Sequence, residues 1–402
     1  TSNLNIAGTG AIGTIAFTGS GGINNLTLNR GSQTLTLGSN ITVNNITTLT
    51  NGALALSNRA LTLAGDVTFH SSSANGDIIG GTTSTLNIGG TGALTNALLM
   101  DQTSTSTRSL NAFIMTRPSS TLTLGSTIAI NSFSFTHGRI SLNDRIVTIN
   151  GVITFPANAS DGAFIGSLNS AFTIAGTSGA AINNSLFMDQ TNANTKTLGA
   201  FTINRSLVTL VMGNDLIIGS AGGSAIFTNG IFDINGNLLT LSGPITFPGG
   251  PTNRGLRGSA TSSLTIDNNP GGTVTGFMYM VQTSAATRHL NSLVFDRTGE
   301  TLTMGNALET FGEILPIAGT IDANDALFIR SDATNKGRIG EVTGVVSGNV
   351  SVETFALGGT TDWANLGPSG INGLTVASWE GQIPMTCLSC PNSPTATGGV
   401  YF

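Results

Sequence analysis

Apolar residues alternate with threonine, serine and asparagine in short segments along most of the chain. Residues 26–28 read Leu-Thr-Leu, and residues 146–149 read Ile-Val-Thr-Ile. Gly, Asn, Ser or Asp separate such segments. A period of two predicts β-strands with one buried face, and no segment keeps the 3.6-residue period of a helix beyond two turns. We therefore predict an all-β protein with very short strands.

One block of sequence recurs four times along the chain: a strand, an arginine, then a second strand that ends in glycine. The arginines are Arg30, Arg117, Arg205 and Arg297, and the glycines are Gly38, Gly125, Gly213 and Gly305. Both series step by 87, 88 and 92 residues. A fixed period indicates one structural unit stacked on copies of itself, so four long repeats of 87–92 residues are predicted.

A second set of matching segments predicts where the chain turns. Residues 51–69, 137–155 and 229–247 align without gaps. Two turn positions in this alignment hold only residue types that tolerate a positive φ. The first is occupied by Gly52, Gly138 and Gly230, and the second by Asn58, Asp144 and Gly236.

These strands and turns predict a parallel β-helix solenoid, in preference to a stack of antiparallel hairpins. Leu26, Thr48 and Val67 mark equivalent strand starts about 20 residues apart, which gives four coils per long repeat and about 15 coils in all. Coils stacked at roughly 4.8 Å would build a rod about 75 Å long. The side chains predicted to point inward are Leu26, Leu28, Leu35, Leu37, Ile41 and Val43.

The repeat pattern fades after about residue 330, so we assign residues 1–340 to the repeat domain. Residues 341–402 are expected to form an atypical cap or the start of a following domain, because terminal repeats of a solenoid usually differ. This segment contains Cys387 and Cys390. Zinc would need two further ligands nearby, so in a secreted protein we expect a small disulfide, with a free thiol pair as the alternative. Because residues 1–10 repeat at 83–92, we also expect a processed piece of a longer protein without a signal peptide.

The composition excludes several classes of function. Only 9% of residues are charged, the net charge is −5, and the chain has two lysines, Lys196 and Lys336. Without a basic patch, nucleic-acid binding is not expected. No apolar stretch of about 18 residues exists that could span a bilayer as a helix. We predict no cofactor and no metal.

Several polar residues invite a chemical role, and each also has a structural interpretation. Asp101 and Asp189 recur in matching segments and could form a carboxylate row for calcium or for sugar cleavage. Copies four coils apart would lie roughly 19 Å from each other, which favours a structural corner. The four repeated arginines could meet an anionic polysaccharide, although hydrogen bonds to corner carbonyls are favoured. The histidines His70, His137 and His289 occupy different repeat positions and are expected at corners or on the surface.

The repeats resemble the β-helical repeats of large secreted surface proteins of the Bacteroidota, of the type exported by the type IX secretion system. The resemblance rests on residues 26–45, 235–247 and 258–266 and covers about residues 1–350. It implies a secreted or outer-surface location, and a secretion translocon or surface-attachment machinery as partner. Many members of that group are adhesin-like or structural, and they share no catalytic residues.

We therefore expect a non-enzymatic stalk, spacer or adhesin-like solenoid, with cell-surface glycans or self-association as further interactions. The alternative is a polysaccharide lyase or hydrolase on a β-helix scaffold. It would need carboxylates that converge on adjacent coils, and the densest candidates are Asp322, Asp325 and Asp332 near Arg330. A carbohydrate-binding module would need exposed aromatic ladders, but aromatic residues are only 6% of the chain.

Overall fold

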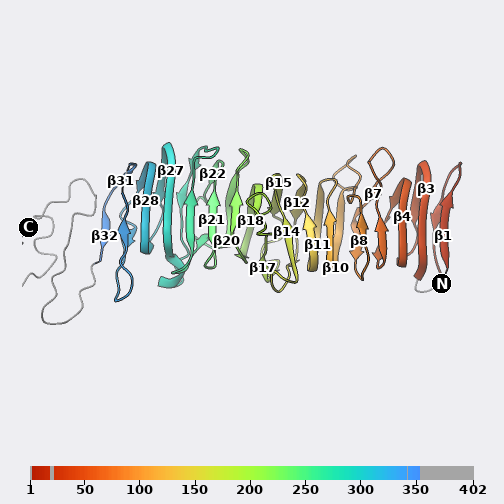
Figure 1. Cartoon of the computed structure of the whole chain (residues 1–402), viewed down its shortest axis with the longest axis horizontal. Coiled ribbons are helices and arrows are strands. Elements are labelled where there is room, and N and C mark those ends of the chain that lie inside the picture. Colours follow the sequence, from red (N-terminus) through yellow and green to blue (C-terminus); the bar gives the residue numbers. More distant parts are fainter. Residues whose placement is uncertain (1, 19–21, 342, 354–402) are drawn as a thin grey trace, which may run out of the picture. The chain divides into compact units, whose positions relative to one another are not determined.

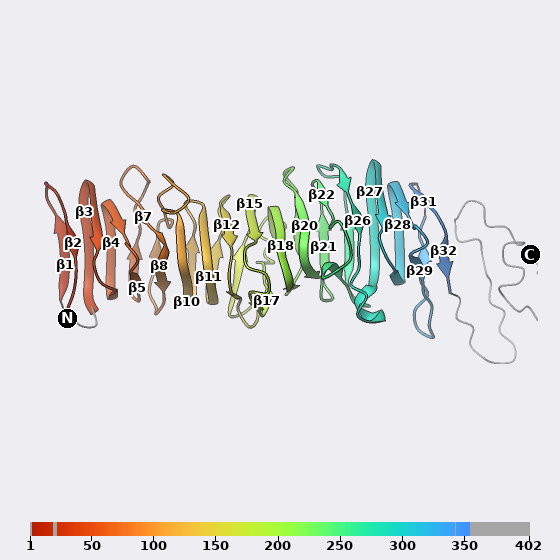
Figure 2. The same cartoon turned by 180° about the vertical axis from the view of Figure 1, so that it is seen from behind.

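The chain winds into a parallel β-solenoid of about 15 coils, as predicted. The computed structural model describes residues 2–18, 22–341 and 343–353, within a compact unit that spans Thr1–Ala356. Successive strands follow one another in chain order along this unit (Figures 1 and 2). All strand ladders in the described residues are parallel and belong to one sheet. The antiparallel hairpin stack is therefore wrong for this part of the chain.

The strands of the first half are β1 (Asn3–Ala7), β2 (Thr14–Ile15), β3 (Gly22–Leu37), β4 (Ile41–Ala55), β5 (Ala60–Leu63), β6 (Asp66–Thr68), β7 (Ile78–Ile79), β8 (Gly81–Ile88), β9 (Leu94–Thr95), β10 (Ser109–Thr123), β11 (Ile128–Ser141), β12 (Ile146–Ile149), β13 (Ile153–Thr154), β14 (Gly162–Ile165), β15 (Ser167–Ile174), β16 (Ile182–Asn183) and β17 (Ser185–Leu186).

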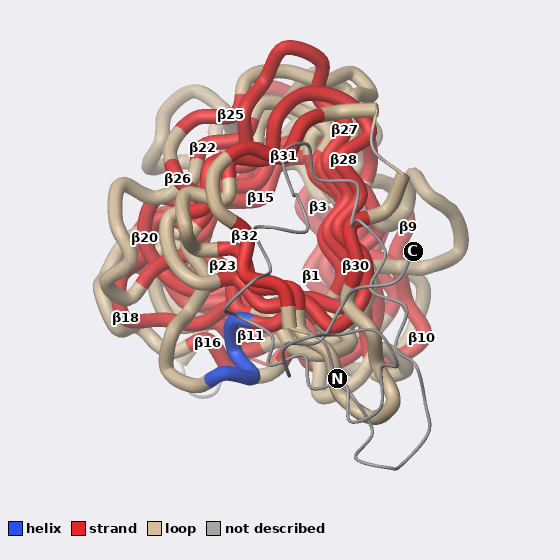
Figure 3. The backbone as a smooth tube through the Cα atoms, turned by 90° about the vertical axis from the view of Figure 1, so that its left-hand side faces the viewer, coloured by secondary structure: helices blue, strands red, loops and turns tan. Residues whose placement is uncertain are grey.

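Those of the second half are β18 (Thr197–Met212), β19 (Leu216–Ile218), β20 (Ala225–Asp233), β21 (Leu238–Leu241), β22 (Ile245–Thr246), β23 (Arg254–Arg257), β24 (Ser263–Ile266), β25 (Val274–Thr275), β26 (Phe277–Met278), β27 (His289–Met304), β28 (Leu308–Asp322), β29 (Leu327–Ile329), β30 (Arg338–Ile339), β31 (Val345–Ser347) and β32 (Val350–Val352). One 3-10 turn, η1 (Ala285–Arg288), appears in blue in Figure 3. Within the described residues, no helix is long and apolar enough to cross a membrane.

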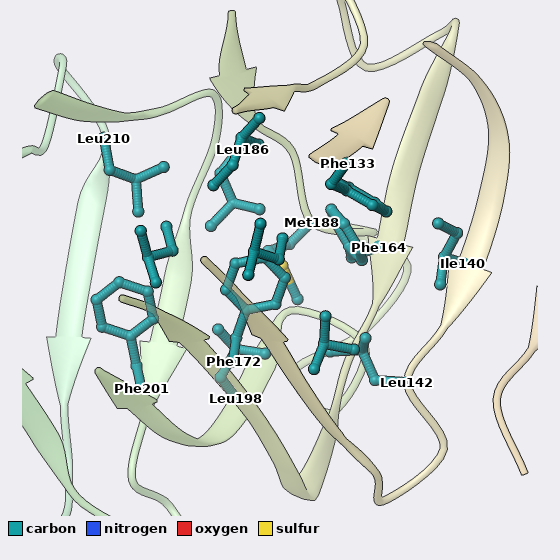
Figure 4. Close-up of a cluster of buried hydrophobic side chains, with 14 of the residues drawn as sticks. Phe133, Ile140, Leu142, Phe164, Phe172, Leu186, Met188, Leu198, Phe201 and Leu210 are labelled. Atoms are coloured by element: carbon teal, nitrogen blue, oxygen red, sulfur yellow. The ribbon is translucent and has the colours of Figure 1, made fainter. Parts of the chain in front are cut away.

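The interior of the coils is a continuous hydrophobic core. Every side chain predicted to point inward is at most 2% exposed, which confirms the period-two interpretation. Phenylalanines fill the middle of the solenoid, where Phe164 and Phe172 pack edge to face with ring centroids 5.4 Å apart (Figure 4). Each buried side chain of this size contributes about 1.5–3 kcal/mol relative to an exposed one. Short strands with few internal contacts are therefore stabilised by burial against the coils on either side.

Coil length varies more than the sequence predicted. Phe113 pairs with Phe133, 20 residues ahead, whereas Phe172 pairs with Phe201, 29 residues ahead. Leu26 pairs with Thr47, one residue before the predicted strand start at Thr48. Longer coils carry extra loop residues between strands, which alternation alone cannot count.

The long repeat corresponds to a column of stacked strands that starts and ends once in each block. The two-residue strands β9, β16 and β25 pair with the preceding coil through β6, β13 and β22, but they have no strand ladder on the opposite side. In each case a strand of 15 or 16 residues follows, namely β10, β18 or β27. These long strands pair with β8, β15 and β24 and not with β9, β16 or β25. At each block boundary one column of strands therefore ends while the neighbouring column continues.

The predicted turn residues have the predicted backbone conformation. Gly52, Gly138 and Gly230 have φ of 94°, 96° and 94°. The second turn position is also left-handed, with φ of 65° at Asn58 and 60° at Asp144. A side chain at Gly52 would also press on the Arg30 carbonyl oxygen, 2.4 Å from an ideal Cβ. Two constraints therefore act on one glycine, which explains its recurrence in the repeat.

Strand pairing continues beyond the predicted boundary at residue 340. β31 and β32 pair in parallel with β28 and β29 and add a further coil. Most of the segment 341–402, predicted to be a cap or the start of a following domain, lies outside the described residues, including Cys387 and Cys390.

Candidate functional site

Three of the four repeated arginines are buried between coils and bind backbone carbonyls. Arg117, Arg205 and Arg297 are 0%, 1% and 0% exposed. Arg117 donates to the Gly92 and Leu63 carbonyls at 3.2 and 3.0 Å, which places its guanidinium across two preceding coils. These contacts lie at the end of the β9 column, where no strand of the next coil continues the ladder. The arginine adds N–H donors at this place, where the Leu63 carbonyl also accepts from the Gly89 amide and the Gly92 carbonyl from the Ser120 hydroxyl.

Arg205 has the most complete carbonyl cage of the four. It donates from Nε to the Ala175 carbonyl at 2.7 Å, from Nη1 to Gly151 at 2.6 Å and to Ala180 at 3.3 Å, and from Nη2 to Ile149 at 2.8 Å. Burial lowers the pKa of Arg205. A buried charge must be compensated, and here carbonyl dipoles do so. Such guanidinium groups cannot meet a polysaccharide on the surface.

Arg30 occupies the equivalent position in the first copy but is half-buried. Its guanidinium donates to the carbonyls of Gly10 and Ala7 at 2.9 and 3.3 Å. The contact pattern is therefore shared, while the depth of burial differs.

The repeated glycines lie directly beneath a side chain of the preceding coil. An ideal Cβ at Gly213 would be 2.3 Å from Phe187, and one at Gly305 would be 2.5 Å from Tyr279. At Gly125 the covering side chain is Leu99, at 2.6 Å. None of these glycines has a positive φ, so close approach rather than backbone conformation requires them.

A recurrent glutamine was missed at the sequence level. Gln102 donates from Nε2 to the carbonyls of Met100 and Thr127, both at 2.9 Å, and so joins adjacent coils. Gln190 and Gln282 make the same pair of bonds in their own copies. The sequence does contain a signal for this residue, because the glutamine persists in the fourth copy although the preceding aspartate is replaced by Val281.

Asp101 and Asp189 occupy matching turns but have different surroundings. Each accepts a backbone hydrogen bond from the threonine two residues ahead, Thr103 or Thr191. Asp189 also forms an ion pair with Arg139. Within the described residues Asp101 forms no ion pair, and it lines an open hollow of about 360 Å³ together with Asp77.

The two carboxyl groups of the hollow have pKa values displaced in opposite directions. Burial raises the pKa of Asp77, and the nearby Asp101 charge raises it further. Burial also acts to raise the pKa of Asp101, but hydrogen bonds from Thr103 and Thr107 outweigh it and lower that pKa. The hollow thus concentrates negative charge that carries a desolvation cost.

A second concentration of ionisable side chains surrounds Glu309 on β28. Glu309 accepts hydrogen bonds from Arg330, Arg288 and His289. Burial raises its pKa, but these donors outweigh burial and hold the pKa at about 2. Arg330 also lies within 3.7 Å of Glu353. The donors come from the coils before and after Glu309, so the network connects successive coils. Its carboxylate is therefore already occupied by these hydrogen bonds.

The carboxylates near Arg330 that were considered for an enzyme do not converge. Asp332 caps its own turn by accepting from the backbone of Thr334 and Asn335, which lowers its pKa to about 2. Asp322 caps a different turn, and Asp325 accepts from Asn349. Arg330 contacts Glu309 and Glu353 instead. In the described segments, no group of three or more histidine, cysteine or acidic side chains could hold a metal ion.

The three histidines have three different environments. His70 is 1% exposed and bonds through Nε2 to the Gly52 carbonyl at 2.7 Å, so it is neither a surface residue nor paired with an acid. Burial lowers its pKa. His137 is exposed beside Thr136, and His289 joins the Glu309 network.

A comparison with protein-family models, curated proteins and solved structures finds no match to this chain. The fold assignment therefore rests on the strand pairing and the buried contacts described above.

Proposed function

We propose that the protein is a non-enzymatic structural solenoid, a stalk or spacer with an adhesin-like role. The observation that carries this proposal is the unbroken parallel pairing from β1 to β32 around one apolar core. Asparagine side chains outside that core connect successive coils, as in the pairs Asn25–Asn3 and Asn45–Asn25. A scaffold in which each coil contacts its neighbours suits mechanical spacing.

Export to the cell surface is part of the same proposal, and the type IX route follows from the resemblance of the repeats. Low charge and few lysines suit an extracellular polar coat. Immunogold labelling of intact cells of the source organism tests the location, with a translocon-deficient strain as control. Surface label that disappears in that strain supports the proposal, whereas label confined to the cytoplasm contradicts it.

Lack of catalysis is tested separately, with the purified protein and a panel of neutral and anionic polysaccharides. We expect no release of reducing ends and no unsaturated products. Cleavage that is lost in Asp101→Asn would instead establish the lyase or hydrolase alternative at the acidic hollow.

A further inference from the structure

The outward surface around Asp101 recurs in three copies that can be compared within this one molecule. The pairing of Ile78 with Met100, Phe164 with Met188 and Leu256 with Met280 aligns these copies coil by coil. In the copy at Asp189, the carboxylate pairs with Arg139 from two coils earlier. In the copy at residue 281 the aspartate is absent, and Asp233 pairs with Arg257 at 3.4 Å. In both of these copies an aspartate is therefore paired with an arginine.

The remaining copy carries two carboxylates, and Arg108 is the basic residue of the same turn. Ala53 stands where Arg139 stands in the next copy, and Asp77 stands where that copy has Ala163. In the part of the chain that the structure describes, no lysine, arginine or histidine forms an ion pair with Asp77 or Asp101. Neither carboxylate is therefore neutralised by an ion pair in the described residues, whereas Asp189 is.

Smaller side chains open this copy to a ligand. Leu99 and Ser126, which line the hollow, take the places of Phe187 and Asn214 in the next copy. Asn214 bonds to both the amide and the carbonyl of Met188, whereas the shorter Ser126 side chain accepts from the Met100 amide. The hollow therefore combines an apolar wall at Leu99 and Met100 with two carboxylates at its rim.

We propose that the hollow between Asp77 and Asp101 binds an arginine side chain presented by a partner protein. The homologous carboxylate, Asp189, shows the chemistry directly, because it accepts a guanidinium while keeping its bond from Thr191. A weakly hydrated, planar guanidinium suits two carboxylates, and its aliphatic stem suits the apolar wall. Calcium would require six to eight oxygen ligands, and two carboxylates do not supply them.

The charge state of the hollow fits this assignment. The raised pKa of Asp77 reflects burial first and the Asp101 charge second, and a bound cation offsets the second contribution. We therefore expect binding to strengthen as pH rises through the range in which Asp77 ionises.

Calorimetric titration of the full chain with Nα-acetyl-arginine amide tests the proposal, with Nα-acetyl-lysine amide and calcium chloride as comparison ligands. We expect saturable binding of the arginine compound, at least about tenfold weaker in Asp77→Asn and in Asp101→Asn, because each removes a charge-assisted bond. Absence of saturable arginine binding, equal binding of the lysine compound, or tighter binding of calcium would overturn it.

Two further variants test the comparison between copies without removing a carboxylate. Ala53→Arg introduces an internal guanidinium at the position of Arg139 and should abolish binding while raising the thermal midpoint. Arg139→Ala should release Asp189 and add a second, weaker site. Circular dichroism and the unfolding midpoint verify that each variant is folded. Undiminished binding in Ala53→Arg would refute the assignment of the hollow as the binding site.

Discussion

The carbonyl cage around Arg205 gives the sharpest test of how the blocks are joined. In Arg205→Met the apolar stem is largely retained while the guanidinium is lost. Ile149 keeps a bond from the Ala175 amide, but within the described part of the chain Arg205 is the only donor to the carbonyls of Ala175, Gly151 and Ala180. The substitution therefore leaves three acceptors at a block boundary without a donor.

The expected loss of stability follows from those three acceptors. Gly151 is buried, whereas Ala175 and Ala180 are partly exposed and can bond to water instead. A buried acceptor left unsatisfied costs about 1–3 kcal/mol, and removal of the guanidinium also removes its own desolvation penalty. We expect a net loss of about 1–3 kcal/mol for Arg205→Met. Arg205→Lys should be intermediate, because an ammonium has three donors on one atom and cannot span the cage.

The assay must resolve local stability, because a solenoid unfolds in units set by contacts between neighbours. Urea denaturation followed by circular dichroism gives the global change, and hydrogen exchange of peptides from residues 149–180 locates it. Arg145→Met, at an exposed arginine that forms no ion pair among the described residues, is the matched control. If both variants unfold at the same urea concentration with unchanged exchange in 149–180, the cage does not stabilise the boundary and the reasoning fails.

Three other perturbations follow from the buried contacts. Gly213→Ala should lower the free energy of unfolding by about 1–3 kcal/mol in urea denaturation, because the new methyl collides with Phe187. Adding Phe187→Ala in the same chain should recover most of this loss. If the losses of the two single variants simply add, the contact is contradicted. Burial lowers the pKa of His70 below its usual 6.5, so the unfolded chain gains a proton there before the folded chain does as pH falls below about 6.5. The free energy of unfolding should therefore drop over that range. The drop should shrink in His70→Gln but persist in His137→Gln. Glu309, with a folded pKa of about 2 against 4.5 ordinarily, should stabilise fully above pH 4.5 and lose that contribution as pH falls toward 2; pH-dependent melting of Glu309→Gln should lack this part of the acid transition.

The fold was predictable because its signals are local and repeated. Alternation identified the inward side chains, and residue types that tolerate positive φ identified the turns at Gly52 and Asn58. Four independent copies reduced the uncertainty of each short segment. Coil length was less accessible, because loops of different length connect strands that stack identically, as the 20- and 29-residue offsets show.

The candidate site was less accessible because its contacts join residues far apart in sequence. Asp101 was recognisable as a repeated residue, but Asp77 belongs to the preceding coil and has no acidic counterpart in the other copies. Arg139 lies 50 residues from Asp189, so no local motif reveals their pairing. The acidic residues near Arg330 are close in sequence but do not converge, because Asp322 and Asp332 cap separate turns and Asp325 bonds to Asn349.

The same geometry explains why arginine, and not another polar residue, recurs once in each long repeat. A strand column ends at β9, β16 and β25, and at each end carbonyls of two successive coils point toward one buried place. A hydroxyl or an amide has too few donors and too short a stem to reach both coils. Only a guanidinium offers five donors in a plane at the end of a long apolar chain. The period of about 88 residues is thus the distance between block boundaries, and the arginine marks the point where one column of strands gives way to the next.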